Sequence, residues 1–408
     1  MSPAGAPHDE TWGVRRRFFP AVEGMRGVAA LLVLFSHVLF IDYGAEGTRG
    51  ILGIWMGSFG VTIFFAISGF LLYRPFLAAR HQGKTVREMV PTYFLRRSVR
   101  IFPAYWVALT LTAFSFFAAL SGVFTHDWWV YYGLLQIYWP AKQLLGLPVA
   151  WTLCIEASFY LVLPLIALAL YKVGAGSRAR HALLWEFGAL GALAAASIAF
   201  NVIVTSDPST VWLINTLGGL MIWFVGGMVL AALQVVHPAS LRLVRRVLAR
   251  PEICWPAGIA LYAMNPLGTF DELPLWLHEI IGPLDVTIAA LLLMGPATLG
   301  DGGRLVRWSL TNRTMVYAGT ISYGIYLYHL PIALWLKAHW PQVVDHHPTW
   351  TLGSLTVLGA VIFGSLSWYL IEKPLMGQVR SVKASFDSRK GGRAAAQAAQ
   401  REAAEPAP

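Results

Sequence analysis

Charged residues are scarce in this sequence of 408 residues. Only 13% of them are Asp, Glu, Lys or Arg, whereas 56% are hydrophobic and the mean hydropathy is +0.57. Soluble proteins carry about 25% charged residues, and their helices need a polar face. Apolar stretches of membrane-spanning length, about 20 residues, recur along nearly the whole chain. We therefore predict an all-α, polytopic transmembrane helical bundle.

Cysteine is scarce as well. The two cysteines, Cys154 and Cys254, both lie in apolar stretches, so they indicate neither a disulfide framework nor a metal site. We expect no metal and no permanently bound cofactor. The sequence also lacks internal repeats and pairs of Pro/Gly-broken helices, which are typical of many transporters.

The apolar stretches predict about ten spans, at residues 20–41, 54–73, 101–122, 149–171, 183–204, 211–234, 252–270, 281–299, 316–337 and 351–371. The segment WWVYYGLLQIYW, residues 128–139, is too short to span and is typical of an interfacial helix or a re-entrant segment. The first apolar stretch is too long for a cleaved signal peptide.

The basic residues predict the orientation. Of the 31 Lys and Arg residues, 27 lie in segments that alternate spans would place on one side, namely 1–19, 74–100, 172–182, 235–251, 300–315 and 372–408. By the positive-inside rule, both termini are cytoplasmic. The net charge of +10 thus reflects topology, and we expect no nucleic-acid partner.

Three regions follow from this map. We expect a cytoplasmic N-terminal segment at 1–19, one transmembrane domain at 20–376, and a polar tail at 377–408 that is disordered and cytoplasmic.

Two ionisable residues interrupt the first span, GMRGVAALLVLFSHVLF. Arg26 and His37 are eleven residues apart, so they lie on one helix face, roughly 16 Å apart along the axis. They could be structural, with Arg26 paired to a carboxylate and His37 bonded to a carbonyl. Ionisable groups inside a membrane more often mark function. The functional interpretation is an anion contact at the mouth of a channel and a titratable base deeper in.

Six blocks, in order, resemble integral-membrane acyltransferase family 3, which includes bacterial polysaccharide O-acetylases and macrolide acylases. They are EGMRGVAALLVLFSH, with ten residues between its Arg and its His, GVTIFFAISGFLL, FLRRSVRIFPAYW, WTLCIEASFYLVLP, ISYGIYLYHLPI and WYLIEKPL. The likeness covers about residues 20 to 376, and six blocks in order are far more specific than any one of them.

This resemblance implies an O-acyltransferase in a bacterial plasma membrane, surrounded by membrane lipids. It would move an acyl group from cytoplasmic acyl-CoA to a hydroxyl of a carbohydrate, a cell-envelope glycolipid or a glycosylated product. Arginine suits phosphate because its planar guanidinium presents a fork of donors. We therefore predict that Arg96, Arg97 and Arg100, together with Arg26, bind the donor.

His37 is the predicted catalytic base. It would take the proton of the acceptor hydroxyl, or relay the acyl group as an acyl-imidazole, and the sequence leaves both routes open. Glu156 lies about seven residues into a helix that we expect to enter from outside, at a depth like that of His37. We predict that Glu156 orients the imidazole, as in a triad. An ion pair between Glu156 and Arg26 is the alternative.

Five further residues are predicted to contact the substrate, and three of them have a structural alternative. Ser68 could instead permit close helix packing, Trp151 could belong to an interfacial aromatic belt, and His329 could be satisfied by a tyrosine hydroxyl. The other two residues are Tyr105 and Tyr323. A different function also stays open at this point, a proton-coupled transporter in which Arg26, His37 and Glu156 form a relay.

Overall fold

The computed structural model describes residues 19–44, 47–81, 85–115, 122–174, 179–236, 239–264, 272–300, 303–344, 348–379 and 381. Within these ranges the chain forms helices and no strand, which confirms the all-α prediction. The predicted segment at 1–19 and tail at 377–408 lie almost entirely outside the described residues, so they stay predictions.

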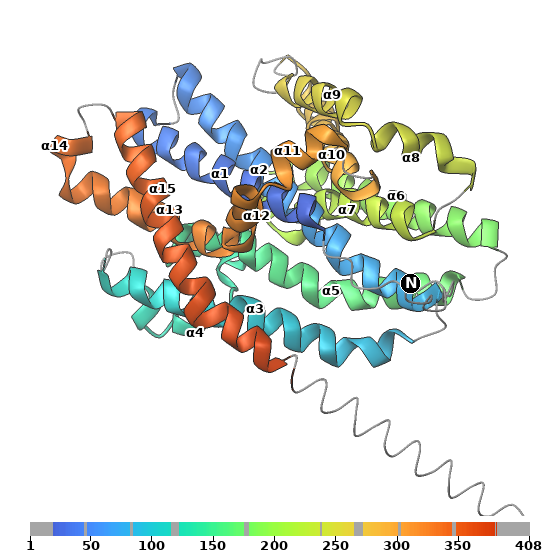
Figure 1. Ribbon diagram of the computed structural model, residues 1–408, viewed down its shortest axis with the longest axis horizontal. Coiled ribbons are helices and arrows are strands. Elements are labelled where there is room, and N and C mark those ends of the chain that lie inside the picture. The colour runs from blue at the N-terminus through green and yellow to red at the C-terminus, as the bar shows by residue number, and fades with distance from the viewer. Residues whose placement is uncertain are drawn as a thin grey trace, which may run out of the picture.

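Long helices make up most of the fold (Figure 1). The helices of thirteen or more residues are α1 (Pro20–Tyr43), α2 (Gly47–His81), α3 (Val86–Ser115), α5 (Trp151–Gly174), α6 (Ala179–Thr205), α7 (Leu217–Val236), α9 (Pro251–Ala263), α10 (Leu275–Leu299), α13 (Ser322–His339) and α15 (Pro348–Ser367). The shorter ones are α4 (Trp128–Tyr132), α8 (Arg242–Leu248), α11 (Arg304–Leu310), α12 (Arg313–Thr320) and α14 (Pro341–Val344). A π-helical turn, Trp368–Glu372, follows α15.

Seven helical stretches of the described residues are long and apolar enough to cross a membrane. They correspond to seven of the ten predicted spans. The other three predicted spans are found as α3, α9 and α13, which do not meet that standard of length and composition. Helix α9 has only thirteen described residues, short of the roughly 20 that a bilayer requires. The seven spans are therefore supported, and the count of ten stays a prediction.

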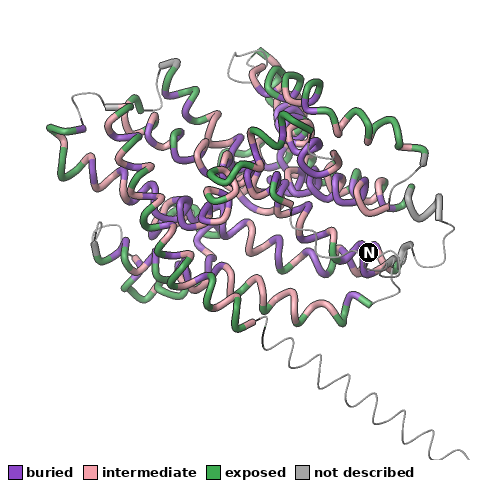
Figure 2. Tube along the Cα trace, in the orientation of Figure 1, coloured by how far each residue is buried: buried purple, intermediate pink, exposed green. Residues whose placement is uncertain are grey.

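Helix α1 lies at the centre of the packing. It contacts α2, α12, α13 and α15, while α2 packs along its other side against α7. Buried residues concentrate along α1, α2, α7 and α13, and exposed positions lie toward the periphery (Figure 2). Large apolar side chains are exposed on the outer helix faces, including Leu165 and Leu370. A lipid-facing surface accounts for so much exposed apolar area, which a soluble monomer rarely shows.

Glycine brings α2 and α7 into backbone contact. A Cβ atom built on Gly227 of α7 would overlap the Ala66 carbonyl oxygen of α2, and one built on Gly69 would overlap the Phe224 carbonyl oxygen. Small residues at such interfaces let membrane helices approach closely.

Gly227→Ala should therefore destabilise the bundle by about 1–3 kcal/mol, because the added methyl forces the α2 and α7 backbones apart. The measurement is the apparent melting temperature of detergent-purified protein. Gly191→Ala on α6 is the matched control, since a Cβ there meets no atom within 4 Å. Equal melting temperatures for both variants would contradict this account of the packing.

The segment between α3 and α5 folds into the protein. It comprises α4 and several short 3₁₀ turns, so residues 128–139 do not form a spanning helix. Ile137, Leu147 and Ala150 have no exposed surface, as a re-entrant segment would require. At its outer edge Lys142 Nζ lies 2.7 Å from Asp127 Oδ2, and this bond holds the pKa of Asp127 below its usual value.

Candidate active site

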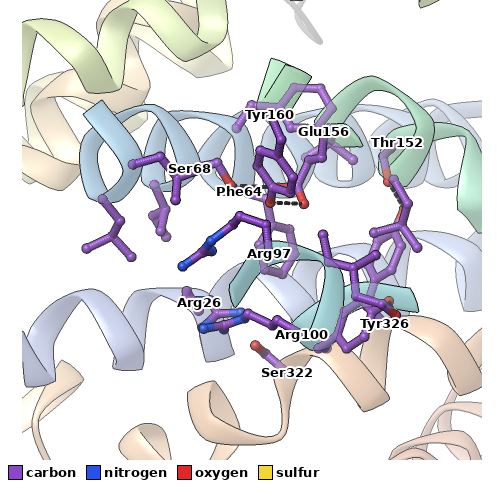
Figure 3. A pocket seen from close by; sticks show the side chains of 18 residues that line it. Arg26, Phe64, Ser68, Arg97, Arg100, Thr152, Glu156, Tyr160, Ser322 and Tyr326 are labelled. Carbon is purple, nitrogen blue, oxygen red and sulfur yellow. Dashed lines mark hydrogen bonds between the residues drawn. The ribbon is translucent and has the colours of Figure 1, made fainter. Parts of the chain in front are cut away.

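A pocket lies between α1, α2, α3, α5 and α13 (Figure 3). Its empty volume is about 790 Å³, counting the part open to solvent. The polar and charged side chains that line it are those of Arg26, Ser68, Arg97, Arg100, Thr152, Glu156, Tyr160, Ser322, Tyr323 and Tyr326.

Positive charge dominates the pocket lining. Arg26 of α1 and Arg97 and Arg100 of α3 point into the same space, where Glu156 is the one carboxylate among the lining residues (Figure 3). Two further carboxylates interact with these arginines but do not line the pocket. Glu23 Oε2 is 3.3 Å from Arg26 Nη1, and the buried Glu372 interacts electrostatically with Arg100. The lining itself therefore offers an anion three guanidinium groups.

Glu156 is held by neutral hydroxyl groups. Ser68 Oγ donates to its Oε1 at 2.7 Å, and Tyr160 Oη donates to its Oε2 at 2.9 Å. The predicted hydrogen bond from His37 to Glu156 is absent from the described part of the chain. Instead, Glu156 lines the same pocket as Arg26. The expectation that Glu156 lies at the depth of His37 is therefore wrong.

The start of α5 explains this error. A helix that begins at the membrane surface would place its sixth residue near the outer side of the bundle. Helix α5 instead begins at Trp151, directly after the buried residues Val149 and Ala150 of the re-entrant segment. Because α5 starts inside the protein, Glu156 lies farther in, at the level of Arg26.

His37 has another partner. Its Nδ1 lies 2.9 Å from the Val33 carbonyl oxygen and 3.2 Å from Nε2 of His329 on α13. His329 has no exposed surface and does not line the pocket, whereas His37 is partly exposed. The structure therefore places His329 against the predicted base rather than against a substrate in the pocket.

The other predicted site residues divide into two groups. Ser68 and Tyr323 line the pocket, as do Arg26, Arg97 and Arg100. Arg96, Tyr105 and Trp151 do not. The Tyr105 side chain is fully buried and donates to the Tyr131 carbonyl oxygen at 2.7 Å, which anchors the re-entrant segment to α3. Arg96 is next to Arg97 in the chain, so it points to a different side of α3.

Four polar lining residues were not among the predicted site residues, namely Thr152, Tyr160, Ser322 and Tyr326. Tyr160 lies four residues after Glu156, a spacing that places both on one helix face and was available as a signal. Tyr326 lines the pocket and donates to the Val149 carbonyl oxygen at 2.8 Å. Glu372 does not line the pocket; a π-helical turn buries it, and Ser367 hydrogen-bonds to it at 3.1 Å.

Tyr326 also connects the pocket to the histidine pair. Its ring centroid is 5.8 Å from that of His329 and 5.9 Å from that of Phe64, which lines the pocket too. The pocket thus adjoins the two histidines through one layer of aromatic side chains. An arginine-lined pocket and an imidazole thus lie along one face of α1.

No group of three or more His, Cys, Asp or Glu that could hold a metal ion occurs among the described residues.

Comparisons with known proteins identify the family of the chain. The acyltransferase family 3 model, named "Acyltransferase domain", matches residues 19–371. Peptidoglycan O-acetyltransferase OatA of Listeria monocytogenes is 24% identical over 379 residues, which cover 88% of this chain and 56% of that protein. O-acetyltransferase OatA of Staphylococcus aureus is 21% identical over 388 residues, 92% of this chain and 60% of that protein.

A third relative, nodulation protein 10 of Rhizobium leguminosarum bv. viciae, is 26% identical over 399 residues, 91% of this chain and 96% of that protein. The chain thus spans little more than half the length of the two O-acetyltransferases and nearly all of the nodulation protein. No solved structure matches the chain. Since the family model covers most of the sequence, the chain belongs to acyltransferase family 3 and is a membrane enzyme that transfers acyl groups.

Proposed function

We propose that the protein is an O-acyltransferase whose donor is acyl-CoA, bound from the cytoplasmic side of a bacterial plasma membrane. The observation that carries this proposal is the convergence of Arg26, Arg97 and Arg100 on one pocket beside the histidine pair. Coenzyme A carries several phosphate charges, and guanidinium forks bind phosphate with short, charge-assisted hydrogen bonds. The positive-inside rule, which predicts the orientation of the chain, also predicts that the arginines of α3 lie on the cytoplasmic side.

In this proposal the donor phosphates bind Arg97 and Arg100, and the acyl-pantetheine arm runs along α1 toward His37. Arg26 and His37 are roughly 16 Å apart along the helix axis, so an extended arm is needed to connect them. Glu156, fixed by Ser68 and Tyr160, limits the excess of positive charge and orients the arginines. Glu156 is thus proposed to act on donor binding, and only indirectly on the base.

His37 then acts at the thioester. As base, its imidazole takes the proton from the acceptor hydroxyl while the oxygen attacks the acyl carbon and the C–S bond breaks. The proton returns to the departing CoA thiolate. In the relay route, the imidazole nitrogen attacks first, CoA leaves as the thiol, and the acyl-imidazole then acylates the hydroxyl. An acyl-enzyme that accumulates when acceptor is withheld would identify the second route.

The acceptor is proposed to be a hydroxyl of a carbohydrate, a cell-envelope glycolipid or a glycosylated product. This rests on the names of two relatives, a peptidoglycan O-acetyltransferase and an O-acetyltransferase. The names of the same relatives favour acetyl as the acyl group; succinyl or a similar small acyl group is the alternative.

Purified protein tests the proposal directly. We expect it to bind CoA and to release free thiol from acetyl-CoA or succinyl-CoA faster when a carbohydrate acceptor is present, with the acyl group recovered on the acceptor by mass spectrometry. The protein should also melt at a higher temperature with CoA, because a ligand of the folded state stabilises it. If CoA neither binds nor reacts with any acceptor offered, the donor assignment is wrong.

A further inference from the structure

His37 and His329 form a directional hydrogen-bond chain. His37 of α1 and His329 of α13 have ring centroids 5.0 Å apart, with Nδ1 of His37 facing Nε2 of His329 at 3.2 Å. Each Nδ1 also faces a carbonyl oxygen one turn earlier on its own helix. These are Val33 at 2.9 Å for His37 and Ile325 at 3.1 Å for His329.

The proton position on His329 follows from its contacts. A carbonyl oxygen can only accept, so the Nδ1 of His329 that faces Ile325 carries the hydrogen. A neutral imidazole has one ring hydrogen. The Nε2 of His329 is then an acceptor, and it points at His37.

The contacts of His37 lead to the same assignment. Its Nδ1 faces two acceptors, the Val33 carbonyl oxygen and Nε2 of His329, so it carries the hydrogen. The opposite assignment would set the Nδ1 lone pair against a carbonyl oxygen and would require His329 to give up its own bond to Ile325. With the hydrogen on Nδ1, the lone pair of His37 lies on Nε2.

We propose that His329 is a positioning residue that holds His37 as the Nδ1–H tautomer, with Nε2 as the reacting nitrogen. This deepens the proposed function and rests on it for the identity of the reaction. Once Nε2 has taken the hydroxyl proton, the imidazolium keeps its Nδ1–H bonded to Val33 and His329, and the proton on Nε2 returns to the CoA thiolate. A buried neutral acceptor thus does for His37 what the carboxylate does in a triad.

The burial of the two rings supports this division of roles. His329 has no exposed surface, whereas His37 is partly exposed, so a substrate meets His37 and not His329. Tyr326 packs against His329, with ring centroids 5.8 Å apart, and lines the proposed donor pocket. The Ile325 carbonyl oxygen and the Tyr326 ring therefore hold His329 in place, and its Nε2 faces His37.

Nitrogen-15 NMR tests the proton positions without any assay of activity. In protein labelled at histidine, we expect protonated Nδ1 and unprotonated Nε2 for both residues, and a scalar ¹⁵N–¹⁵N coupling between Nδ1 of His37 and Nε2 of His329. His37→Gln and His329→Gln assign the signals, since each removes one partner. Protonated Nε2 on His37, or no coupling between the two rings, would overturn the assignment.

Kinetics test the positioning role. His329→Leu removes the acceptor and should lower kcat by about 10- to 100-fold, the range expected for one hydrogen bond to a charged group, with the KM for acyl-CoA unchanged. His329→Gln can place an amide oxygen near the former Nε2 and should recover most of the lost rate. His339→Gln is the matched control, because His339 makes the same contact to a carbonyl one turn earlier, Trp335 at 3.1 Å, on the exposed end of α13.

The outcomes separate this inference from the proposed function. A wild-type protein that shows the coupling but transfers no acyl group would refute the function and leave the proton assignment standing. An active wild type with an equally active His329→Leu variant would refute the positioning role. A melting temperature of His329→Leu well below that of the wild type would show that its loss of rate comes from misfolding. In that case the rate of His329→Gln decides whether His329 has the positioning role.

Discussion

His37→Ala is expected to bind acyl-CoA as tightly as the wild type and to lose acyl transfer by about a hundredfold or more, the contribution of a positioned general base. The physical reason is that His37 does not line the arginine pocket proposed to bind the donor phosphates, so its removal should affect the reacting atoms alone. The measurement pairs CoA binding by calorimetry with initial rates of acyl transfer.

His339→Ala provides the control for His37→Ala. It removes an exposed imidazole with an intrahelical carbonyl contact and should leave both binding and rate unchanged. Retained transfer in His37→Ala would remove this residue from the mechanism. Loss of CoA binding in the same variant would instead place His37 in the donor pocket.

The second large effect is expected at the arginines of α3. Arg97→Gln and Arg100→Gln should each weaken CoA binding by about tenfold or more, because each loses a charge-assisted hydrogen bond of roughly 1.5–3 kcal/mol. Arg96→Gln is the matched control, since Arg96 is adjacent in the chain but does not line the pocket. Added salt should weaken wild-type binding only partly, because Arg97 and Arg100 are partly buried and screening acts less on partly buried charges.

A truncated donor makes this test specific for phosphate. S-acetyl-pantetheine lacks the phosphate groups of CoA, so Arg97→Gln should change its KM little. If Arg97→Gln weakens acetyl-CoA and S-acetyl-pantetheine equally, the arginine supports the fold or the thioester rather than the phosphates. If Arg96→Gln weakens CoA binding as much as Arg97→Gln, the pocket does not hold the donor.

The sequence predicted the composition of the site better than its arrangement. Arg26 and His37 share a face of α1 because 3.6 residues per turn fixes that geometry within one helix. Arg97 and Arg100, three residues apart, line one pocket for the same reason. Relations within a helix can be computed from spacing alone, so these predictions needed no knowledge of the fold.

Relations between helices depended on the connecting segment. Glu156 was assigned the wrong depth because α5 begins inside the bundle, after the buried turn at Val149 and Ala150. The hydropathy of a stretch shows how apolar it is. It does not show whether the helix begins at the membrane surface or inside the protein. The contact between His37 and His329 joins residues 292 positions apart, which no spacing rule reaches.

Irregular backbone accounts for the other differences. The predicted span 316–337 is divided at Ile321 into α12 and α13, which places Ser322 at the pocket. The π-helical turn at Trp368–Glu372 buries Glu372, where the apolar stretch 351–371 predicted a regular helix. π-helical turns often occur at functional sites, but nothing in the local sequence specified this one.

The structure of the protein bound to a non-hydrolysable acyl-CoA analogue tests the central claim most directly. We predict that phosphate oxygens lie within hydrogen-bond distance of Arg97 and Arg100, and that the acyl carbonyl carbon lies beside Nε2 of His37, with His329 still bonded to Nδ1. Phosphates bound elsewhere on the cytoplasmic face, or an acyl group that ends in the arginine pocket away from His37, would contradict the account.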